Sequence, residues 1–406
     1  MYARHVRRCI SVLFAVLSSC TLFEDPPPPP PPRPPPPPPP APIAAARPVA
    51  TRAAFDLVSG PAGTFLAWGV PATDGGGVRL LELGPGGAAR GSETEIGRES
   101  GATPGSAEQA PNQLVELAMA ASADHLGIAW SLIVGGEFHV EAAYSAAPPA
   151  FAHAVDLGEM EPGTSGRGNV VVSPLASGAL YVAHRITRGP CHDTTSGAAV
   201  CSRFARTRIP GGDAVRTDGA SEIPVACAPL LPGAVGGAAT GEPWFYGVCN
   251  GATSTTTVFV INPDPASQYA AATDVLTGCT PSSMARADSG AVLRARCGDD
   301  EAFARIDPMG RTTHEMRHAV LTTRCDQGRP VLEAREGDSA LARRLTESES
   351  RIEAWLPVTI APEGSRAVWT GEAVLVALPM GPEGEREVGL RRFECSGADF
   401  HRTDRP

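Results

Sequence analysis

The sequence predicts an all-β fold, a β-propeller of about seven four-stranded blades, which follows an N-terminal leader and a proline-rich segment. Three observations predict this fold. Short apolar runs recur in pairs along residues 53–406, and a polar turn separates the members of each pair. Glycine and proline are frequent, at 44 and 41 residues, and outside one proline tract they lie between these runs. Such a distribution favours many turns and short strands over long helices.

The paired apolar runs are the repeating unit of the predicted propeller. Their spacing of roughly 40 to 60 residues is typical of blades with loops of variable length. One hairpin cannot bury its apolar face, whereas several stacked around an axis share a continuous core. Tandem β-sandwich domains are the alternative, and they would show fewer, longer units. The pairs are 64–68 with 78–83, 126–130 with 138–142, 179–183 with 203–207, 244–248 with 257–261, 292–296 with 302–306, 331–335 with 341–345, and 373–377 with 388–392.

Residues 1–19 have the pattern of a signal peptide. Arginines near the N-terminus precede an apolar run at 9–17 that is too short to span a bilayer as a helix. The run ends in Leu17-Ser-Ser-Cys20, which resembles the lipobox of bacterial lipoproteins. The resemblance implies cleavage before Cys20 and a lipid on that cysteine. An ordinary signal peptide that is cleaved nearby is the alternative.

The residues after the leader predict a tether. Thr21, rather than an aspartate, follows Cys20, and the resemblance to proteobacterial lipoproteins then implies the outer membrane, with the chain facing the periplasm or the cell surface. Residues 20–52 form the predicted linker, in which 26–40 are all proline except Arg33. A polyproline II rod of this length reaches on the order of 45 Å. A PxxP ligand for a peptide-binding domain is the alternative interpretation.

Charge narrows the possible partners. The net charge is −10, and removal of the leader arginines makes it more negative, so the chain has no electrostatic reason to bind nucleic acid. The sequence contains no lysine, which excludes Schiff-base, Ser-Lys and P-loop mechanisms because each needs a lysine amine. We expect the membrane as a partner through the lipid, together with a protein or glycan ligand.

The cysteines predict disulfides. Besides Cys9 and Cys20 there are eight, an even number that favours pairing in an oxidising compartment. No pair has C-x-x-C spacing. Their places in the repeat favour four pairings within or between units, although eight cysteines allow about 105 connectivities. These pairings are Cys191–Cys201, Cys227–Cys249, Cys279–Cys297 and Cys325–Cys395.

One string carries a possible chemistry. His314-Glu-Met-Arg-His318 matches H-E-x-x-H and resembles the zincin metallopeptidases. The resemblance implies zinc bound by His314 and His318, with Glu315 activating a water molecule and Glu336 as a third ligand.

The repeat offers a different interpretation of this string. Shifted by about 39 residues, the string aligns with 352–356, which has the alternation of an outer blade strand. A strand would hold the two histidines roughly 13 Å apart, too far to share one metal ion. The charged Arg317 also departs from the zincin pattern. We therefore expect a non-enzymatic binding or scaffold module without a cofactor, with a zinc peptidase as the alternative.

Overall fold

The computed structural model describes most of the region that follows the proline-rich segment. All the described residues belong to one compact unit of the chain, Pro40–Pro406, and none of their helices is long and apolar enough to cross a membrane. The leader, Cys20 and the proline-rich segment lie outside them. The described residues are 54–69, 77–96, 113–121, 125–134, 137–151, 154–160, 170–174, 180–189, 201–209, 216–223, 234–237, 243–250, 256–261, 270–287, 290–307, 311–381 and 387–403.

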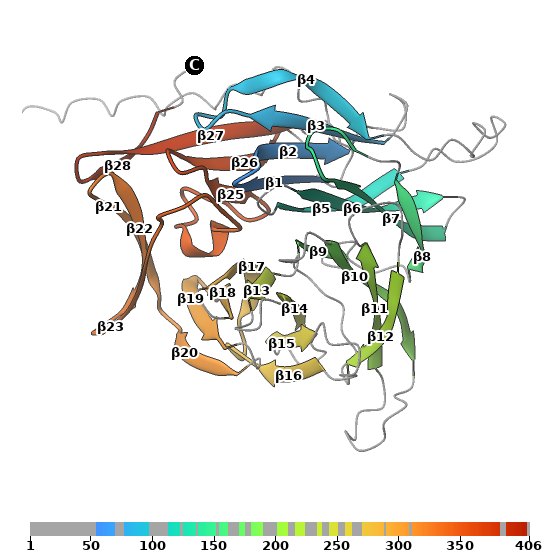
Figure 1. The fold of residues 1–406 in the computed structure, drawn as a ribbon. Coiled ribbons are helices and arrows are strands. Elements are labelled where there is room, and N and C mark those ends of the chain that lie inside the picture. Colours follow the sequence, from blue (N-terminus) through green and yellow to red (C-terminus); the bar gives the residue numbers. More distant parts are fainter. Residues whose placement is uncertain are drawn as a thin grey trace, which may run out of the picture. The chain divides into compact units, whose positions relative to one another are not determined.

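The described strands form antiparallel sheets in which each strand pairs with its neighbour in the chain (Figure 1). Five of these sheets have four strands. They contain β1 (Phe55–Gly60), β2 (Gly63–Gly69), β3 (Val78–Leu83) and β4 (Ala89–Ile96); β5 (Gln113–Ala121), β6 (Leu126–Val134), β7 (Glu137–Ser145) and β8 (Val155–Met160); β9 (Val170–Pro174), β10 (Leu180–Gly189), β11 (Cys201–Ile209) and β12 (Arg216–Ile223); β13 (Ala234–Gly237), β14 (Pro243–Asn250), β15 (Thr256–Ile261) and β16 (Ala270–Asp274); and β17 (Thr280–Arg286), β18 (Ala291–Cys297), β19 (Asp300–Ile306) and β20 (Thr312–Met316).

The C-terminal part of the chain departs from this pattern, because it forms one sheet of three strands and one of five. A short 3₁₀ helix, η3 (Glu353–Trp355), precedes β25. The strands are β21 (Val320–Asp326), β22 (Arg329–Glu336) and β23 (Ser339–Arg344), and then β24 (Glu349–Ser350), β25 (Arg366–Trp369), β26 (Val374–Met380), β27 (Glu387–Ser396) and β28 (Asp399–Arg402).

The predicted all-β propeller is confirmed, and the paired runs of the sequence are paired strands. Each predicted pair coincides with two hydrogen-bonded neighbours: β2 with β3, β6 with β7, β10 with β11, β14 with β15, β18 with β19, β22 with β23 and β26 with β27. The expectation of seven four-stranded blades is wrong, because only five of the sheets in the described residues have four strands.

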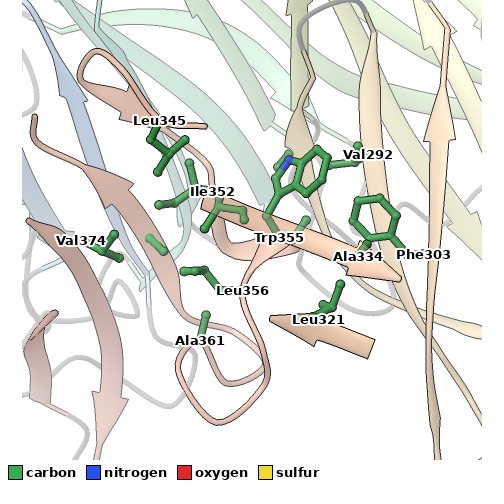
Figure 2. Packing of buried hydrophobic residues seen from close by; sticks show 14 of the residues in the cluster. Val292, Phe303, Leu321, Ala334, Leu345, Ile352, Trp355, Leu356, Ala361 and Val374 are labelled. Atoms are coloured by element: carbon green, nitrogen blue, oxygen red, sulfur yellow. The ribbon is translucent and has the colours of Figure 1, made fainter. Parts of the chain in front are cut away.

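The expectation of an outer strand at 352–356 is also wrong. These residues form η3 and the residues that flank it, and they are buried. Figure 2 shows Trp355 among Val292, Phe303 and Ala334, which come from the two preceding sheets. The ring centroids of Phe303 and Trp355 lie 4.9 Å apart. Burial of the large indole explains the difference, since a solvent-facing outer strand would leave it in water.

Apolar clusters fill the spaces between neighbouring sheets. One cluster joins the first sheet to the second through residues such as Val58, Leu80 and Ile128. Another cluster joins the first sheet to the last, where Leu57 and Trp68 share a core with Leu375 and other residues of the last sheet. The first and last sheets are therefore packed together although they lie at opposite ends of the described chain, as closure of a propeller requires.

Two of the predicted disulfides are present in the structure. Cys279–Cys297 links residues 18 positions apart, and Cys325–Cys395 links residues 70 positions apart. The second bridge ties β21 to β27, and the N–H of Cys325 also donates to the carbonyl of Ala398 at 3.3 Å. It therefore fastens the three-stranded sheet to the last sheet.

Candidate functional site

The zincin-like string lies on β20 and in the bend that follows it. His314 and Glu315 are strand residues that pair with Arg305 and Ala304 of β19. Their side chains alternate in exposure along the strand. A strand cannot place His314 and His318 one helical turn apart, as zinc ligation by H-E-x-x-H requires. The local geometry therefore gives the peptidase alternative no support.

The structure does bring some of the residues implied by that resemblance together. The backbone N–H of His318 donates to Oε1 of Glu336 at 2.9 Å, and Nδ1 of His318 lies 2.9 Å from Oδ2 of Asp300. Glu315 forms an ion pair with Arg317 at 3.0 Å. Among the residues described, no group of three or more His, Cys, Asp or Glu side chains is placed to hold a metal ion. The contacts of His318 with Asp300 and Glu336 connect neighbouring turns of the surface, whereas the contact of Glu315 is local.

A buried ionic network lies at the junction of the first and last sheets. Its centre is Asp56 on β1, whose side chain is fully buried. The Asp56 carboxylate accepts hydrogen bonds from the N–H groups of Leu57 at 2.9 Å and Met119 at 2.7 Å. Met119 lies on β5, so one carboxylate connects the first sheet to the second.

Two arginines near the C-terminal end of the chain complete the network: Arg366 begins β25, and Arg351 follows β24 in the loop before η3. Arg351 Nη2 donates to Asp56 Oδ2 at 2.5 Å, and Arg366 Nε lies 3.4 Å from Oδ1. Both arginine side chains are largely buried, at 15% and 17% exposed. Arg351 has a φ of 62°, a left-handed backbone conformation that a non-glycine residue adopts at a cost. The contact with Asp56 helps to offset that cost.

Glu353 is the second acid of the network. It is buried, lies 3.9 Å from Arg351 Nη1, and accepts a hydrogen bond from the N–H of Ala367 at 3.3 Å. Burial raises the pKa of the Glu353 carboxyl, while Arg351 and Arg366 act in the opposite direction. Desolvation of a carboxylate disfavours its charged form, and here that effect exceeds the attraction of the arginines.

Arg294 on β18 anchors the segment that replaces the expected outer strand. The residue is 3% exposed, and its guanidinium donates to the carbonyls of Leu356 at 2.5 Å and Ala361 at 3.1 Å. Burial lowers its pKa, against the attraction of nearby glutamates that include Glu353. A separate contact joins the first and last sheets, because Ser350 Oγ accepts from the N–H of Ser59 at 2.7 Å and donates to its carbonyl at 2.8 Å.

Sequence reasoning missed this network. A single Asp in the strand Phe55–Gly60 and scattered arginines resemble solvated residues, and their partners come from the far end of the chain. The sequence does show an acidic residue, Asp56, inside a short apolar strand. A buried carboxylate needs a partner, so this position could have indicated a buried ionic contact.

The remaining predicted cysteine sites lie outside the described part of the structure. Cys20, Cys191 and Cys227 are outside the described residues, as are the side chains of Cys201 and Cys249 on β11 and β14. Lipidation of Cys20 and the pairings Cys191–Cys201 and Cys227–Cys249 therefore stay predictions.

Comparison with known proteins gives distant likenesses only. No family model and no curated protein matches the chain. A sialidase of Trypanosoma rangeli bound to 2,3-difluorosialic acid is 9% identical, with a TM-score of 0.47 over 86% of this chain and 57% of that chain. A Hadza microbial sialidase is 9% identical, with a TM-score of 0.42 over 84% and 65%. SapL1 lectin bound to alpha methyl fucoside is 10% identical, with a TM-score of 0.42 over 87% and 96%. The chain thus spans less than two thirds of either sialidase.

Proposed function

We propose that the protein is a lipid-tethered binding or scaffold module. Its propeller binds a protein or glycan partner at a distance from the outer membrane. The tether rests on the lipobox-like Leu17-Ser-Ser-Cys20 and on the proline-rich segment at 26–40, which suits a stiff spacer. The propeller is the domain that binds the partner. No cofactor or zinc ion enters this proposal.

The proposal of a non-enzymatic role rests on one observation: charged side chains of the propeller form structural contacts. Asp56 accepts two backbone N–H groups and contacts two arginines, while Arg294 binds two carbonyls. His318 and Glu336 join neighbouring turns. Each of these side chains has a structural task, and the rigid platform that they build suits binding.

Labelling with radioactive palmitate in a bacterial host tests the tether. We expect the chain to be labelled and to fractionate with membranes, and Cys20→Ala to abolish both. Cys9→Ala is the matched control, because it removes the other leader cysteine and should leave the label intact. An unlabelled wild-type chain, or a label that survives Cys20→Ala, would contradict the tether.

A zinc measurement tests the absence of peptidase chemistry. The purified chain is equilibrated with zinc and dialysed, and its bound metal is measured beside that of His314→Ala. We expect both chains to retain equal, trace amounts. One zinc ion per wild-type chain that is lost in His314→Ala, together with peptide hydrolysis, would overturn the non-enzymatic proposal.

A further inference from the structure

The three-stranded sheet ends in a strand that has one unpaired edge. β23 pairs with β22 on one side, and in the described part of the chain no strand pairs with its other side. In the preceding sheet the equivalent third strand, β19, is covered by β20. An exposed edge presents a row of backbone N–H and C=O groups to any strand that fits.

The edge is open because the segment that would cover it is used elsewhere. Residues 352–356 align in sequence with β20, yet Ile352, Trp355 and Leu356 are buried between sheets. Arg294 holds the carbonyl of Leu356 at 2.5 Å. Moving this segment to the edge of β23 would expose its apolar side chains and leave Arg294 without the carbonyl of Leu356, so this segment does not cover the edge.

The hairpin turn fixes which backbone groups face outward. Glu336 pairs with Ser339 across a two-residue turn, Gly337-Asp338, and such a turn is closed by a hydrogen-bonded pair. Hydrogen-bonded and non-hydrogen-bonded pairs then alternate along the strand. It follows that Ala340, Ala342 and Arg344 direct their N–H and C=O groups away from β22. All three residues are exposed.

The sequence along this edge is complementary to itself in the antiparallel direction. About a twofold axis at Leu341, Ala340 lies opposite Ala342, and Asp338 lies opposite Arg344. Ala340 and Ala342 both direct their backbone groups outward, so this register satisfies the hydrogen-bonding pattern of an antiparallel pair. Asp338 lies in the turn beyond the strand and contributes its side-chain charge to the second pair. The alanines leave room for a second strand, and the charges attract across it. A parallel arrangement in register would instead place Arg344 against Arg344.

We propose that β23 is a self-association edge, which pairs antiparallel with β23 of a second copy of this chain. The two three-stranded sheets then become one continuous six-stranded sheet across the twofold axis. The proline-rich segment is unsuited to this edge, because proline has no N–H to donate. The proposal goes beyond the tethered binding module and does not depend on the lipid at Cys20.

The present contacts of Arg344 are compatible with this pairing. Its guanidinium lies 3.3 Å from Asp326 Oδ2 and 2.9 Å from Gln327 Oε1, and the two charged side chains are 38% and 44% exposed. Asp338 of the second copy would add another carboxylate to the same exposed guanidinium. Arg343 points to the other face of the strand and pairs with Glu349 at 2.7 Å, so it is not needed for association.

Pairing of one strand edge buries a small interface, and we expect weak association in solution. Two chains on one membrane experience a high effective concentration, which would favour the pair there. Association that depends on Asp338 and Arg344 should also weaken as salt rises.

Sedimentation velocity over a concentration series tests the proposal. The full chain carries Cys20→Ser, so that the proposed lipid cannot cause association. We expect a monomer–dimer equilibrium that Ala342→Pro weakens by about tenfold or more, because each copy loses one intermolecular N–H donor. Ala342→Ser is the matched control and should leave the dimer unchanged. Thermal unfolding by circular dichroism checks that Ala342→Pro stays folded.

Charge reversal gives an independent readout. Asp338→Arg and Arg344→Asp should each weaken the dimer, and the two together should restore it, since the pair is then exchanged across the axis. Hydrogen exchange in a peptide that spans 337–345 should slow as protein concentration rises. A monomer at every attainable concentration, a dimer indifferent to Ala342→Pro and to charge reversal, or an edge already protected in the monomer would overturn the proposal. The palmitate label of the wild-type chain is unaffected by any of these outcomes.

Discussion

Substitution of Asp56 by alanine should destabilise the propeller more than any other single polar change at its closure. The substitution leaves the N–H groups of Leu57 and Met119 without their acceptor, and it removes the buried partner of Arg351. Breaking a buried ion pair from one side costs about 3–5 kcal/mol. The unsatisfied N–H groups act in the same direction, but the network responds as a unit, so we expect a total loss of about 4–5 kcal/mol.

Urea unfolding of the purified protein measures this loss, with Arg311→Ala as the control. Arg311 is 74% exposed and pairs with Asp307 at 2.8 Å, so its removal should cost less than about 1 kcal/mol. A double-mutant cycle of Asp56→Ala with Arg351→Ala should show strong coupling. Hydrogen exchange should quicken in β1, β5 and β25 ahead of other strands. If Asp56→Ala unfolds within about 1 kcal/mol of the wild type, the network does not hold the closure.

Three further perturbations test the same packing. Arg294→Met should cost about 2–4 kcal/mol by leaving the carbonyls of Leu356 and Ala361 buried without donors; unchanged proteolysis within 351–365 would refute this anchor. Burial raises the pKa of Glu353, so the stability that this residue contributes is fully present below its unfolded pKa and is lost as pH rises through the folded value. Glu353→Gln removes the buried charge, so it should raise the melting temperature at neutral pH and not at low pH. An equal shift at both pH values would contradict a raised pKa for Glu353. Replacing Cys325 and Cys395 by serine should cost about 4 kcal/mol, against about 3 kcal/mol for Cys279 and Cys297, because the loop of 70 residues exceeds that of 18; the opposite order in urea unfolding would refute the loop argument.

The middle strands of each sheet were predictable because they are covered on both faces and on both edges. Strands such as β2 and β26 are therefore apolar over most of their length, and this pattern can be recognised in the sequence. Outer strands lack this signal, as β4 shows, where Ala89–Ile96 is mostly exposed. The Cys279–Cys297 disulfide was predictable from its place in the repeat, since the hairpin of β17 and β18 brings the two cysteines together. Cys325–Cys395 was predicted as the pair that remained, because it joins two different sheets and no local pattern indicates it.

The segment at 352–356 was predicted wrongly for a physical reason. Ile-Glu-Ala-Trp-Leu alternates like a strand, yet the size of Trp355 and the anchor at Arg294 place it between sheets as η3. Neither of these determinants is local. The Asp56 network could not be predicted for the same reason. An aspartate in an apolar strand indicates a buried partner but not which residue it is, and Arg351 lies 295 residues away.

The closure between the first and last sheets also governs how the chain can be made. The core around Leu57 and Trp68 stays open until residues near Leu375 arrive. A chain that is synthesised from its N-terminus therefore carries a first sheet with an incomplete core through most of its synthesis. Contacts of such long sequence separation form late and slowly. Truncation near the C-terminus should then destabilise the first sheet, although its strands are synthesised first. Proteases would then be expected to cleave the N-terminal strands of a chain whose defect lies at the C-terminus.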